Sequence, residues 1–320
     1  MNFEDRYFPG NNKKIGLLGV PLGFGAETKG SELGTTAIRL ARFRGDDLVG
    51  HIKGLGYELV DHGDIEILPP DRDDGDSQSP KHLKEVLLAC EKMSESVRSI
   101  LSRDEMPVIL GGDHSIAAGT FSGVSSFFNS RDEDIGLIWF DAHADMNTPE
   151  SSPSGNSHGM PLAVLLGRGA PELVNLEGFS PKIDPKFCAH IGGRDLDLGE
   201  KRLINELGMR DNFFTMSDID KRGMLACVND AIAIASQAKG GYAVTFDVDI
   251  IDPRFAPGSG TLVRGGITYR EAHLALEVIY EAGGMRSFEI VEVNPMLDRS
   301  NITAKLAGEL ILSVLGNTVL

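Results

Sequence analysis

The sequence predicts an α/β fold in which helices cover both faces of a parallel β-sheet. Short apolar runs alternate with amphipathic stretches over the whole length of the 320-residue chain. A strand–helix–strand order repeated in this way is typical of parallel sheets that are covered on both sides. No internal repeat and no linker-like segment divides the chain, so we expect a single domain over residues 1–320.

Eight apolar runs are predicted to form the strands of this sheet. In chain order they are residues 15–20, 57–60, 106–110, 135–140, 187–191, 212–215, 242–246 and 286–291. Helical periodicity is clearest in three of the stretches between them, which are residues 82–101, 222–236 and 269–282. In the first of these, Leu83, Val86 and Cys90 recur at the spacing of one helix face.

Composition and charge restrict the partners of the protein. With 41% hydrophobic and 24% charged residues, the chain has the composition of a globular protein. Its formal net charge of −16 is repulsive for nucleic acid and for anionic lipid, whereas a cationic small molecule is compatible with it. No run approaches the roughly 20 apolar residues of a membrane span. The expected partner is therefore a small molecule, and neither a nucleic acid nor a membrane.

The expected location of the protein is the cytoplasm. Residues 1–14 contain no apolar segment like the core of a signal peptide. The three cysteines, Cys90, Cys188 and Cys227, are far apart and fit neither a disulfide framework nor a CxxC metal site. We interpret them as small buried hydrophobic residues in a reducing compartment.

Residues that can bind metal ions follow three of the predicted strands. Strand 106–110 is followed by Gly111 and Gly112, which permit a tight turn that presents His114. Open α/β sheets place their ligands just beyond the carboxyl ends of the strands. His114 is therefore a candidate ligand, although a histidine in a turn is more often simply solvated.

Two further strands run directly into acidic motifs. Strand 135–140 leads to Asp141, His143 and Asp145, and a strand that continued would place these three side chains on one face. Strand 242–246 is followed in the same way by Asp247 and Asp249. Carboxylates gathered at one sheet edge repel one another, and a bound cation would keep them ionised. Capping of turns is the alternative interpretation of these aspartates.

The candidate ligand set indicates two metal ions and a hydrolysis. It contains four carboxylates, two imidazoles and no thiolate: His114, Asp141, His143, Asp145, Asp247 and Asp249. This mixture favours Mn²⁺ over Zn²⁺ or Cu²⁺, and six ligands are too many for one ion. Two ions about 3.5 Å apart can hold one water between them, lower its pKa and direct it at an electrophilic carbon or phosphorus.

Five motifs carry a resemblance to a known family. GGDHS, DAHAD, SGNSHGMP, TFDVDIIDP and VEVNP occur in this order, and the chain resembles the ureohydrolase superfamily over residues 14–315, most closely arginase. The resemblance implies one three-layer α/β/α domain with an eight-stranded parallel sheet. It implies two Mn²⁺ ions per subunit and a homo-oligomer, either a trimer or a hexamer. One ion would be bound by His114, Asp141, Asp145 and Asp247, and the other by Asp141, His143, Asp247 and Asp249.

The resemblance also implies a substrate site. Its members are Asn147, Ser152, Ser154 and Asn156 toward the α-carboxylate of an amino acid, Asp195 and Asp197 toward its α-amino group, and Thr261. Glu292 matches the residue that holds the guanidinium group, which a carboxylate can bind through two N–H bonds. His158 matches a histidine at the mouth of the site that shuttles protons near its ordinary pKa of about 6.5. Together with Asp145, these two residues are the predicted catalytic residues.

The predicted reaction is hydrolysis of L-arginine to L-ornithine and urea by a hydroxide that bridges two Mn²⁺ ions. The Ser-Gly-Asn run at 154–156 favours an amino acid over agmatine, which lacks the carboxylate. A guanidinobutyrate-type ureohydrolase stays open, because Ser157, Gly193 and Leu262 depart from the family pattern, and an agmatinase is a further alternative. A non-catalytic, metal-binding regulatory descendant is a further alternative, but such a protein would be expected to have lost at least one of the six ligands.

Overall fold

One parallel sheet of eight strands lies at the centre of the computed structural model, which describes residues 14–70 and 80–318. The strands are β1 (Lys14–Val20), β2 (Glu58–Asp64), β3 (Met106–Gly111), β4 (Gly136–Phe140), β5 (Cys188–Ile191), β6 (Phe213–Phe214), β7 (Tyr242–Asp247) and β8 (Met285–Val291). Their spatial order is β2-β1-β3-β8-β7-β4-β5-β6, and all neighbours are parallel. All eight predicted strands are confirmed, with small shifts at their ends.

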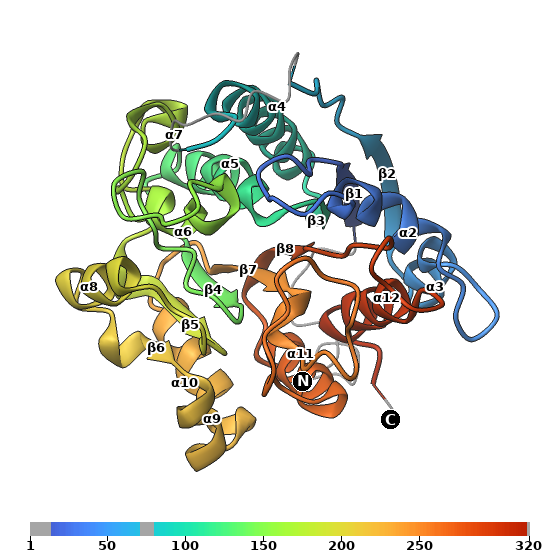
Figure 1. Ribbon diagram of the computed structural model, residues 1–320. Helices are drawn as coiled ribbons and strands as arrows, with labels where there is room; N and C mark the ends of the chain where they lie inside the picture. The colour runs from blue at the N-terminus through green and yellow to red at the C-terminus, as the bar shows by residue number, and fades with distance from the viewer. Residues whose placement is uncertain (1–13, 71–79, 319–320) are drawn as a thin grey trace.

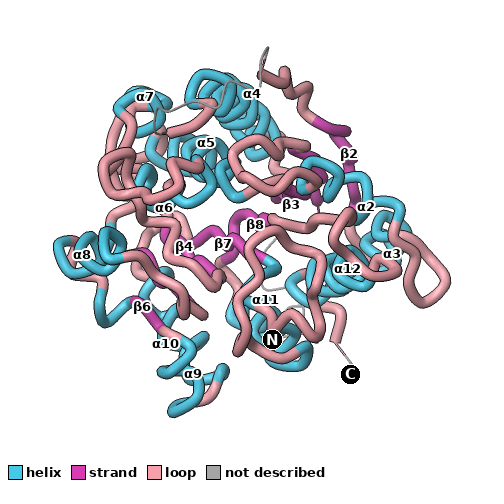
Figure 2. Tube along the Cα trace, viewed as in Figure 1, coloured by secondary structure: helices cyan, strands magenta, loops and turns pink. Residues whose placement is uncertain are grey.

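Helices cover both faces of this sheet. They are α2 (Gly34–Leu40), α3 (Leu48–Gly54), α4 (Leu83–Ser102), α5 (Ala117–Asn129), α6 (Pro161–Leu165), α7 (Pro171–Val174), α8 (Leu198–Glu206), α9 (Met216–Arg222), α10 (Met224–Ala235), α11 (Tyr269–Ala282) and α12 (Ile302–Val314). Helices α4 and α5 pack together on one face, and α10, α11 and α12 pack side by side on the other (Figures 1 and 2). The three-layer α/β/α fold is therefore confirmed.

Short 3-10 helices occupy several of the connections. They are η1 (Ser31–Leu33), η2 (His114–Ile116), η3 (Ser157–Gly159), η4 (Leu176–Gly178), η5 (Pro185–Phe187), η6 (Arg210–Asn212) and η7 (Val248–Ile250). Three of them, η2, η3 and η7, contain residues of the predicted site. A 3-10 turn is tighter than an α-helical turn, so it can redirect the chain immediately after a strand.

Side chains of the central strands alternate between two separate cores. In β4, Leu137 and Trp139 pack on the side of α4 and α5, whereas Ile138 and Phe140 pack on the side of α10 to α12. Every residue of this strand is buried. Burying one such side chain contributes about 1.5 to 3 kcal/mol, and both faces of the strand gain this contribution. This is why the strands appear in the sequence as continuous apolar runs.

Two of the predicted helices agree closely with the structure, and the third is divided. Helix α11 spans residues 269–282 as predicted and begins with a capping box between Thr268 and Glu271. Residues 222–236 form the end of α9 and the whole of α10, because Gly223 between them has a φ of 80° that ends one helix and starts the next.

No helix in residues 14–70 and 80–318 is long and apolar enough to cross a membrane. The three cysteines are free and buried, which agrees with their interpretation as small hydrophobic residues. Burial raises the pKa of the Cys90 and Cys188 thiols to about 12. Residues 1–13, on which the expected location mainly rests, lie outside the described residues.

Candidate active site

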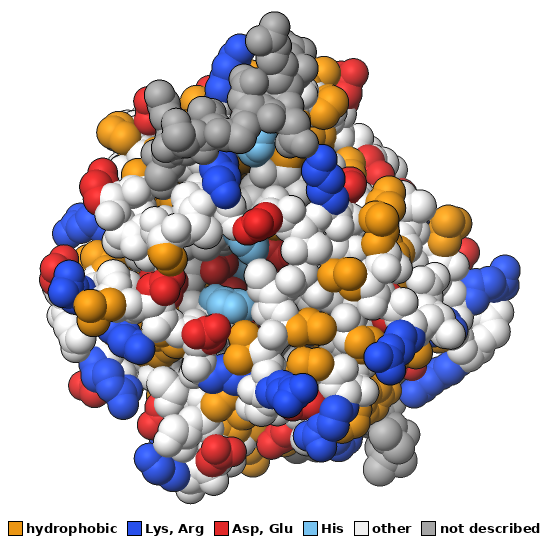
Figure 3. All heavy atoms as spheres, viewed as in Figure 1, with side chains coloured by type: hydrophobic (Ala, Val, Ile, Leu, Met, Phe, Trp, Pro, Cys, Tyr) orange, Lys and Arg blue, Asp and Glu red, His pale blue; other side chains and the backbone are white. Residues whose placement is uncertain are grey.

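The candidate active site lies beyond the carboxyl ends of four neighbouring strands at the centre of the sheet. These strands are β3, β8, β7 and β4, which are adjacent in space although they are distant in sequence. At or just after their ends stand His114, Glu292, Asp247 and Asp141. Parallel strands share one carboxyl edge, so the fold brings these side chains to one place. Figure 3 shows a hollow there in which histidine and acidic side chains lie together.

Tight turns, rather than continued strands, bring the metal-type side chains together. Strand β4 ends at Phe140, and Asp145 has a left-handed backbone with a φ of 52°. Strand β7 ends at Asp247, and Asp249 lies in η7. A strand period of two is therefore not what aligns these residues. The turns aim several successive carboxylates inward, which a regular strand would not do over so short a distance.

Gly112 allows the turn before His114 because its backbone lies against that of Leu22. A Cβ atom on Gly112 would lie 1.8 Å from the carbonyl oxygen of Leu22. The amide of Asp113 donates to the same carbonyl over 2.7 Å. The glycine is thus required by close approach of two backbone segments and not by a left-handed conformation, which Gly112 does not adopt.

Three carboxylates surround one imidazole nitrogen in the first cluster. Nδ1 of His114 lies 3.0 Å from Oδ2 of Asp141, 3.0 Å from Oδ2 of Asp145 and 3.2 Å from Oδ2 of Asp247. All four residues are buried. His114, Asp141 and Asp145 are placed so that one ligand atom from each could bind a single metal ion.

A second cluster shares Asp141 with the first. Nδ1 of His143 lies 3.0 Å from Oδ2 of Asp249 and 3.4 Å from Oδ1 of Asp141. Asp141, His143 and Asp249 form a second group that could hold a metal ion. The two clusters use different oxygens of Asp141, which is the arrangement that a bridging carboxylate needs. The hydroxyl of Thr261 donates to Oδ2 of Asp249 over 3.0 Å and supports this cluster from outside.

The tautomer of His114 shows that the first cluster fits a cation. Oγ1 of Thr245 lies 3.0 Å from Nε2 of His114 and donates its proton to Oε1 of Glu289 over 3.0 Å. Thr245 must therefore accept from Nε2, and Nδ1 of a neutral His114 faces the carboxylates with a lone pair. Within the described residues, neither Nδ1 nor Oδ2 of Asp145 makes a hydrogen bond. A metal ion would satisfy all of these atoms at once.

The same crowding shifts the pKa values of the cluster. Burial and the charge of Asp141 raise the pKa of Asp145 to about 7. Burial, followed by the charges of Asp249 and Asp141, raises the pKa of Asp247 well above its usual value. Burial opposes protonation of His143, but the neighbouring carboxylates outweigh it and raise the pKa. Bound cations would remove the repulsion among the carboxylates and keep them ionised.

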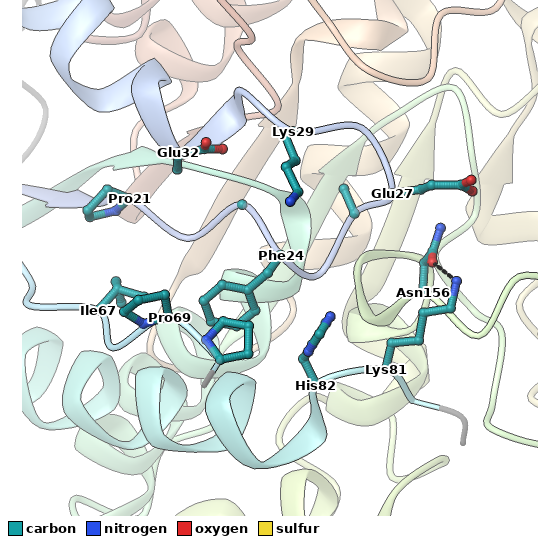
Figure 4. Close-up of a pocket in the computed structure, with 13 residues that line it drawn as sticks. Pro21, Phe24, Glu27, Lys29, Glu32, Ile67, Pro69, Lys81, His82 and Asn156 are labelled. Carbon is teal, nitrogen blue, oxygen red and sulfur yellow. Dashed lines mark hydrogen bonds between the residues drawn. The ribbon is translucent and has the colours of Figure 1, made fainter. Parts of the chain in front are cut away.

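A cavity of about 160 Å³ opens over the two clusters. The cluster residues in its wall are His114, His143, Asp145 and Asp247. The predicted substrate and catalytic residues that line it are Asn147, Ser152, Ser154, His158, Asp195, Asp197 and Thr261. Two predicted substrate residues are not among those that line it. Asn156 lies in the wall of a neighbouring cavity with Phe24 and Lys81 (Figure 4), and Glu292 lies behind the wall, where it is bonded to His114 and His158.

The loop over this cavity presents hydroxyl donors. Oγ of Ser152 accepts from the amide of Gly155 over 2.9 Å, and Oγ of Ser154 accepts from the amide of Asn156 over 3.2 Å. A hydroxyl that accepts in this way keeps its own proton for donation. Both hydroxyls line the cavity, so this wall suits an anionic group such as a carboxylate.

Another part of the cavity wall is acidic. Asp195 and Asp197 follow strand β5, and Oδ2 of Asp197 accepts from the side-chain amide of Asn147 over 2.8 Å. The carbonyl oxygen of that amide accepts from the Ser151 hydroxyl over 2.9 Å, which fixes its orientation. This wall suits an ammonium group, and the cavity as a whole is complementary to a zwitterion.

Glu292 and His158 form a buried pair beside the first cluster. Glu292 has a left-handed backbone with a φ of 64°, and its Oε1 accepts from the amide of His114 over 2.9 Å. The same oxygen lies 3.0 Å from Nδ1 of His158. Burial alone would lower the pKa of His158, but the pairing with Glu292 raises it to about 9. This pairing therefore favours the protonated form of His158.

Glu200 is a residue of the site that the sequence analysis missed. It is buried, lines the cavity and accepts from the amides of Met146 over 3.1 Å and Asp197 over 2.7 Å. Burial raises its pKa to about 7. The signal that could have identified it is the D-x-x-E spacing of a capping box, which Asp197 and Glu200 form at the start of α8.

Two further supporting residues were also missed. Glu289 is fully buried in β8 and accepts from the hydroxyls of Thr120 and Thr245, so it lies directly behind His114. Nη2 of Arg194 donates to the carbonyl of Asp249 over 2.7 Å and so holds η7 in place. A glutamate inside a buried apolar strand is a signal for the first, whereas the second follows only from the tertiary structure.

Carboxylates and imidazoles gathered at the carboxyl edge of an all-parallel sheet, in a three-layer fold, define a metal-dependent hydrolase. Comparison with known proteins gives the family. The model of the Arginase family matches residues 13–316. The arginase of Bacillus subtilis (strain 168) is 44% identical over 310 residues, which cover 97% of this chain and 100% of that protein. The arginase of Bacillus caldovelox is 43% identical over 310 residues, covering 96% and 100%.

Solved structures agree with the sequence comparison. The native structure of Bacillus caldovelox arginase at pH 5.6 matches with a TM-score of 0.89 and 42% identity, covering 96% of this chain and 99% of that chain. The structure of Entamoeba histolytica arginase in complex with L-ornithine matches with a TM-score of 0.85 and 29% identity, covering 95% and 99%. The chain belongs to the arginase family, and the resemblance inferred from the five motifs is confirmed.

Proposed function

We infer that this protein hydrolyses L-arginine to L-ornithine and urea. Membership of the arginase family supports the reaction. The observation that supports arginine as the substrate is that Ser152 and Ser154 line the same cavity as His114 and His143. An amino acid whose guanidinium reaches the metal-type clusters could place its carboxylate at the hydroxyl donors. Agmatine would leave these donors without an anion, so an agmatinase is not favoured.

We propose that two Mn²⁺ ions occupy the two clusters. One would be held by His114, Asp141, Asp145 and Asp247, and the other by Asp141, His143, Asp247 and Asp249. The hard carboxylate oxygens, the two imidazoles and the absence of thiolates from this set support manganese. When bound, two such ions would supply the Lewis-acid chemistry that lets water attack a guanidinium carbon near neutral pH.

Glu292 is proposed to hold the guanidinium group. Its Oε1 is already used by the amide of His114 and by His158. Oε2 makes no hydrogen bond to the residues that the structure describes, so it is available to accept from a guanidinium N–H. Because Oε1 is tethered on two sides, Oε2 is held in one orientation. This tethering would position the planar substrate group before reaction.

Asp145 and His158 are proposed to move the protons. Asp145 lines the cavity and can accept a proton from the attacking water through the carboxylate oxygen that does not bind a metal ion. His158 faces Glu292 through Nδ1, which leaves Nε2 to donate a proton to the departing amine. The raised pKa of His158 favours this residue as the acid, because it is protonated at neutral pH. Asp197 and Asp195 would bind the α-amino group on the acidic wall.

Urea release by the purified, Mn²⁺-loaded protein tests the proposal. Arginine, agmatine and guanidinobutyrate are compared side by side, with the chelator-treated protein as the control. Urea from arginine well above the other two, and none after chelation, is the expected result. A preference for agmatine or guanidinobutyrate would contradict the assigned substrate but leave the metal site intact. No urea from any of the three would overturn the assigned reaction.

We also propose that the chain is a single domain over residues 1–320 that forms a trimer or hexamer in the cytoplasm. The continuous family match over residues 13–316 supports the single domain. Light scattering would give the number of subunits, and cell fractionation would give the location. Limited proteolysis that released two stable fragments would contradict the single domain.

A further inference from the structure

The proposed substrate brings a carboxylate toward a strongly acidic cavity. Five carboxylates line it, namely Asp145, Asp195, Asp197, Glu200 and Asp247. Its lining, as far as the described residues form it, includes neither lysine nor arginine. Positive charge from a residue just outside the cavity would offset this acidity and favour an α-carboxylate at the hydroxyl donors. This step rests on the proposed function.

Lys81 supplies a positive charge that is attached directly to the substrate loop. Its ammonium donates to Oδ1 of Asn156 over 2.9 Å, and Figure 4 shows this bond at the wall between the loop and the start of α4. The Lys81 amide donates to the carbonyl of Gly155 over 2.8 Å, and the Ser157 hydroxyl donates to the carbonyl of Lys81 over 2.5 Å. Lys81 therefore contacts three successive residues of the loop.

The ammonium determines the orientation of the Asn156 side chain. A lysine ammonium has donors only, so the atom that faces it must be the carboxamide oxygen. The NH₂ group of Asn156 is consequently turned away from Lys81. Two preceding residues of the loop, Ser152 and Ser154, already present their hydroxyl protons as donors. The carboxamide oxygen of Asn156 is bonded to Lys81, so it does not face a substrate carboxylate as a second acceptor. The loop therefore offers hydroxyl donors together with the positive charge of Lys81.

We propose that Lys81 is a positioning residue that makes the enzyme selective for substrates with an α-carboxylate. It acts by holding Gly155 and Asn156 in place. The amides of these two residues donate to the Ser152 and Ser154 hydroxyls, which line the cavity. The positive charge of Lys81 also offsets the acidity of the cavity. The matching chemistry is an amino acid with a guanidinium side chain. A decarboxylated analogue such as agmatine carries an ammonium near this position and gains nothing from Lys81.

Lys81→Met removes the charge while leaving the backbone attachment intact. Two of the three bonds to the loop use the backbone of Lys81 and do not depend on its side chain. Lys84→Met is the matched control, because Lys84 is exposed only three residues further along the chain. Lys81→Arg keeps the charge, and Lys81→Gln is a second neutral variant that retains a donor. Melting temperatures of all four variants are measured first, so that altered folding is recognised.

The decisive measurement is the steady-state kinetics of urea release from arginine and from agmatine. Lys81→Met is expected to raise KM for arginine about ten-fold with kcat within about two-fold, and to leave kcat/KM for agmatine unchanged or higher. Lys81→Arg should restore most of the affinity for arginine. Lys84→Met should leave KM and kcat unchanged for both substrates. Equal losses for arginine and agmatine would overturn the proposal, because a purely structural role would affect both alike.

Binding of L-ornithine gives a second readout that does not depend on turnover. L-Ornithine keeps the α-carboxylate, and calorimetric titration of the Mn²⁺-loaded protein should show a Kd about ten-fold higher in Lys81→Met. An unchanged Kd would overturn the role of Lys81. A wild-type protein that binds L-ornithine but releases no urea from arginine would contradict the proposed function, while the comparison of Kd values would still decide the role of Lys81.

Discussion

Nδ1 of His114 lies 3.0 Å from Oδ2 of Asp145, yet neither atom makes a hydrogen bond within the described part of the chain. Both are buried, and an unsatisfied buried polar atom costs about 1 to 3 kcal/mol. A cation between them would remove this cost for both residues. The cluster should therefore be a source of instability without metal and a source of stability with it.

Removal of metal ions by a chelator is expected to lower the melting temperature by about 5 °C or more. A ligand present at a hundred times its Kd stabilises the folded state by about 2.7 kcal/mol, and more than one ion would add to this. Differential scanning fluorimetry measures the change, and added Mn²⁺ should reverse it. In His114→Ala, elemental analysis should find about one ion fewer per chain. Wild-type metal content in this variant would show that His114 is not a ligand.

Asp249→Ala should reduce activity far more than Ser152→Ala. Asp249 lies in the second cluster and is held by Thr261, so its loss should lower kcat/KM for arginine by about a thousand-fold or more. Ser152 offers one hydroxyl to the carboxylate, so its loss should raise KM by about ten-fold with little change in kcat. Steady-state urea assays separate the two patterns. A larger loss in Ser152→Ala would mean that the clusters are not the reaction centre.

The fold could be predicted from the sequence because the strands are buried on both faces. Leu137 to Phe140 in β4, for example, must all be apolar, since each faces one of the two cores. Strand β6 contains only Phe213 and Phe214, and it lies within the predicted run 212–215. Helix ends are less predictable, because a single glycine such as Gly223 divides one periodic stretch into two helices.

The candidate site could be predicted only in part. Asp141 and Asp247 stand directly at strand ends, where their sequence position fixes their place at the sheet edge. The roles of Glu289 and Lys81 depend on contacts with residues more than 40 positions away, which no local pattern contains. Asn156 follows the motif in sequence, but its side chain is directed to Lys81 and it lines a different cavity from Ser152.

Two of the three departures from the family pattern have a structural reason. The Ser157 hydroxyl donates to the carbonyl of Lys81, which an apolar residue could not do. A Cβ atom on Gly193 would lie 2.5 Å from the ring of Phe213, so the stacking of Phe213 on His190 requires glycine there. Leu262 is 41% exposed, and nothing in the structure explains the leucine.

Glu289→Gln is expected to weaken metal binding about ten-fold. Glu289 accepts from Thr120 and Thr245, and Thr245 in turn accepts from Nε2 of His114, which sets the tautomer that presents Nδ1. A glutamine offers one oxygen acceptor in place of two, so the hydrogen bonds that orient Thr245 and His114 are disturbed. Supporting partners of this kind typically contribute 10- to 100-fold in metal affinity.

Competition of the Glu289→Gln protein with a chelating dye measures the change in metal affinity. Glu281→Gln is the matched control, because Glu281 is exposed at the end of α11. It should leave the affinity at the wild-type value. The same affinity in both variants would mean that Glu289 serves only the packing of the sheet against α5.

His190 should make the stability of the protein depend on pH below about 6.5. The side chain is fully buried against Phe213, with Nε2 2.6 Å from the carbonyl oxygen of His143, and burial lowers its pKa to about 4. An unfolded histidine has a pKa of about 6.5 and so binds protons first as the pH falls. The stability that neutral His190 contributes is therefore complete above pH 6.5 and is lost progressively between about pH 6.5 and 4.

His190→Gln keeps a donor for the carbonyl of His143 but cannot titrate in this range. Urea denaturation of the chelator-treated proteins at about pH 7.5 and about pH 4.5 isolates the effect, because metal loss on acidification then plays no part. The free energy of unfolding of the wild type should fall between these pH values by about 2 to 3 kcal/mol more than that of His190→Gln. Carboxyl groups whose pKa is raised by burial, such as that of Glu200, favour the folded state as the pH falls. They do so equally in the wild type and in His190→Gln, so the comparison removes their contribution. If the free energy of unfolding falls equally with pH in both proteins, protonation of His190 does not destabilise the folded state, and the prediction is wrong.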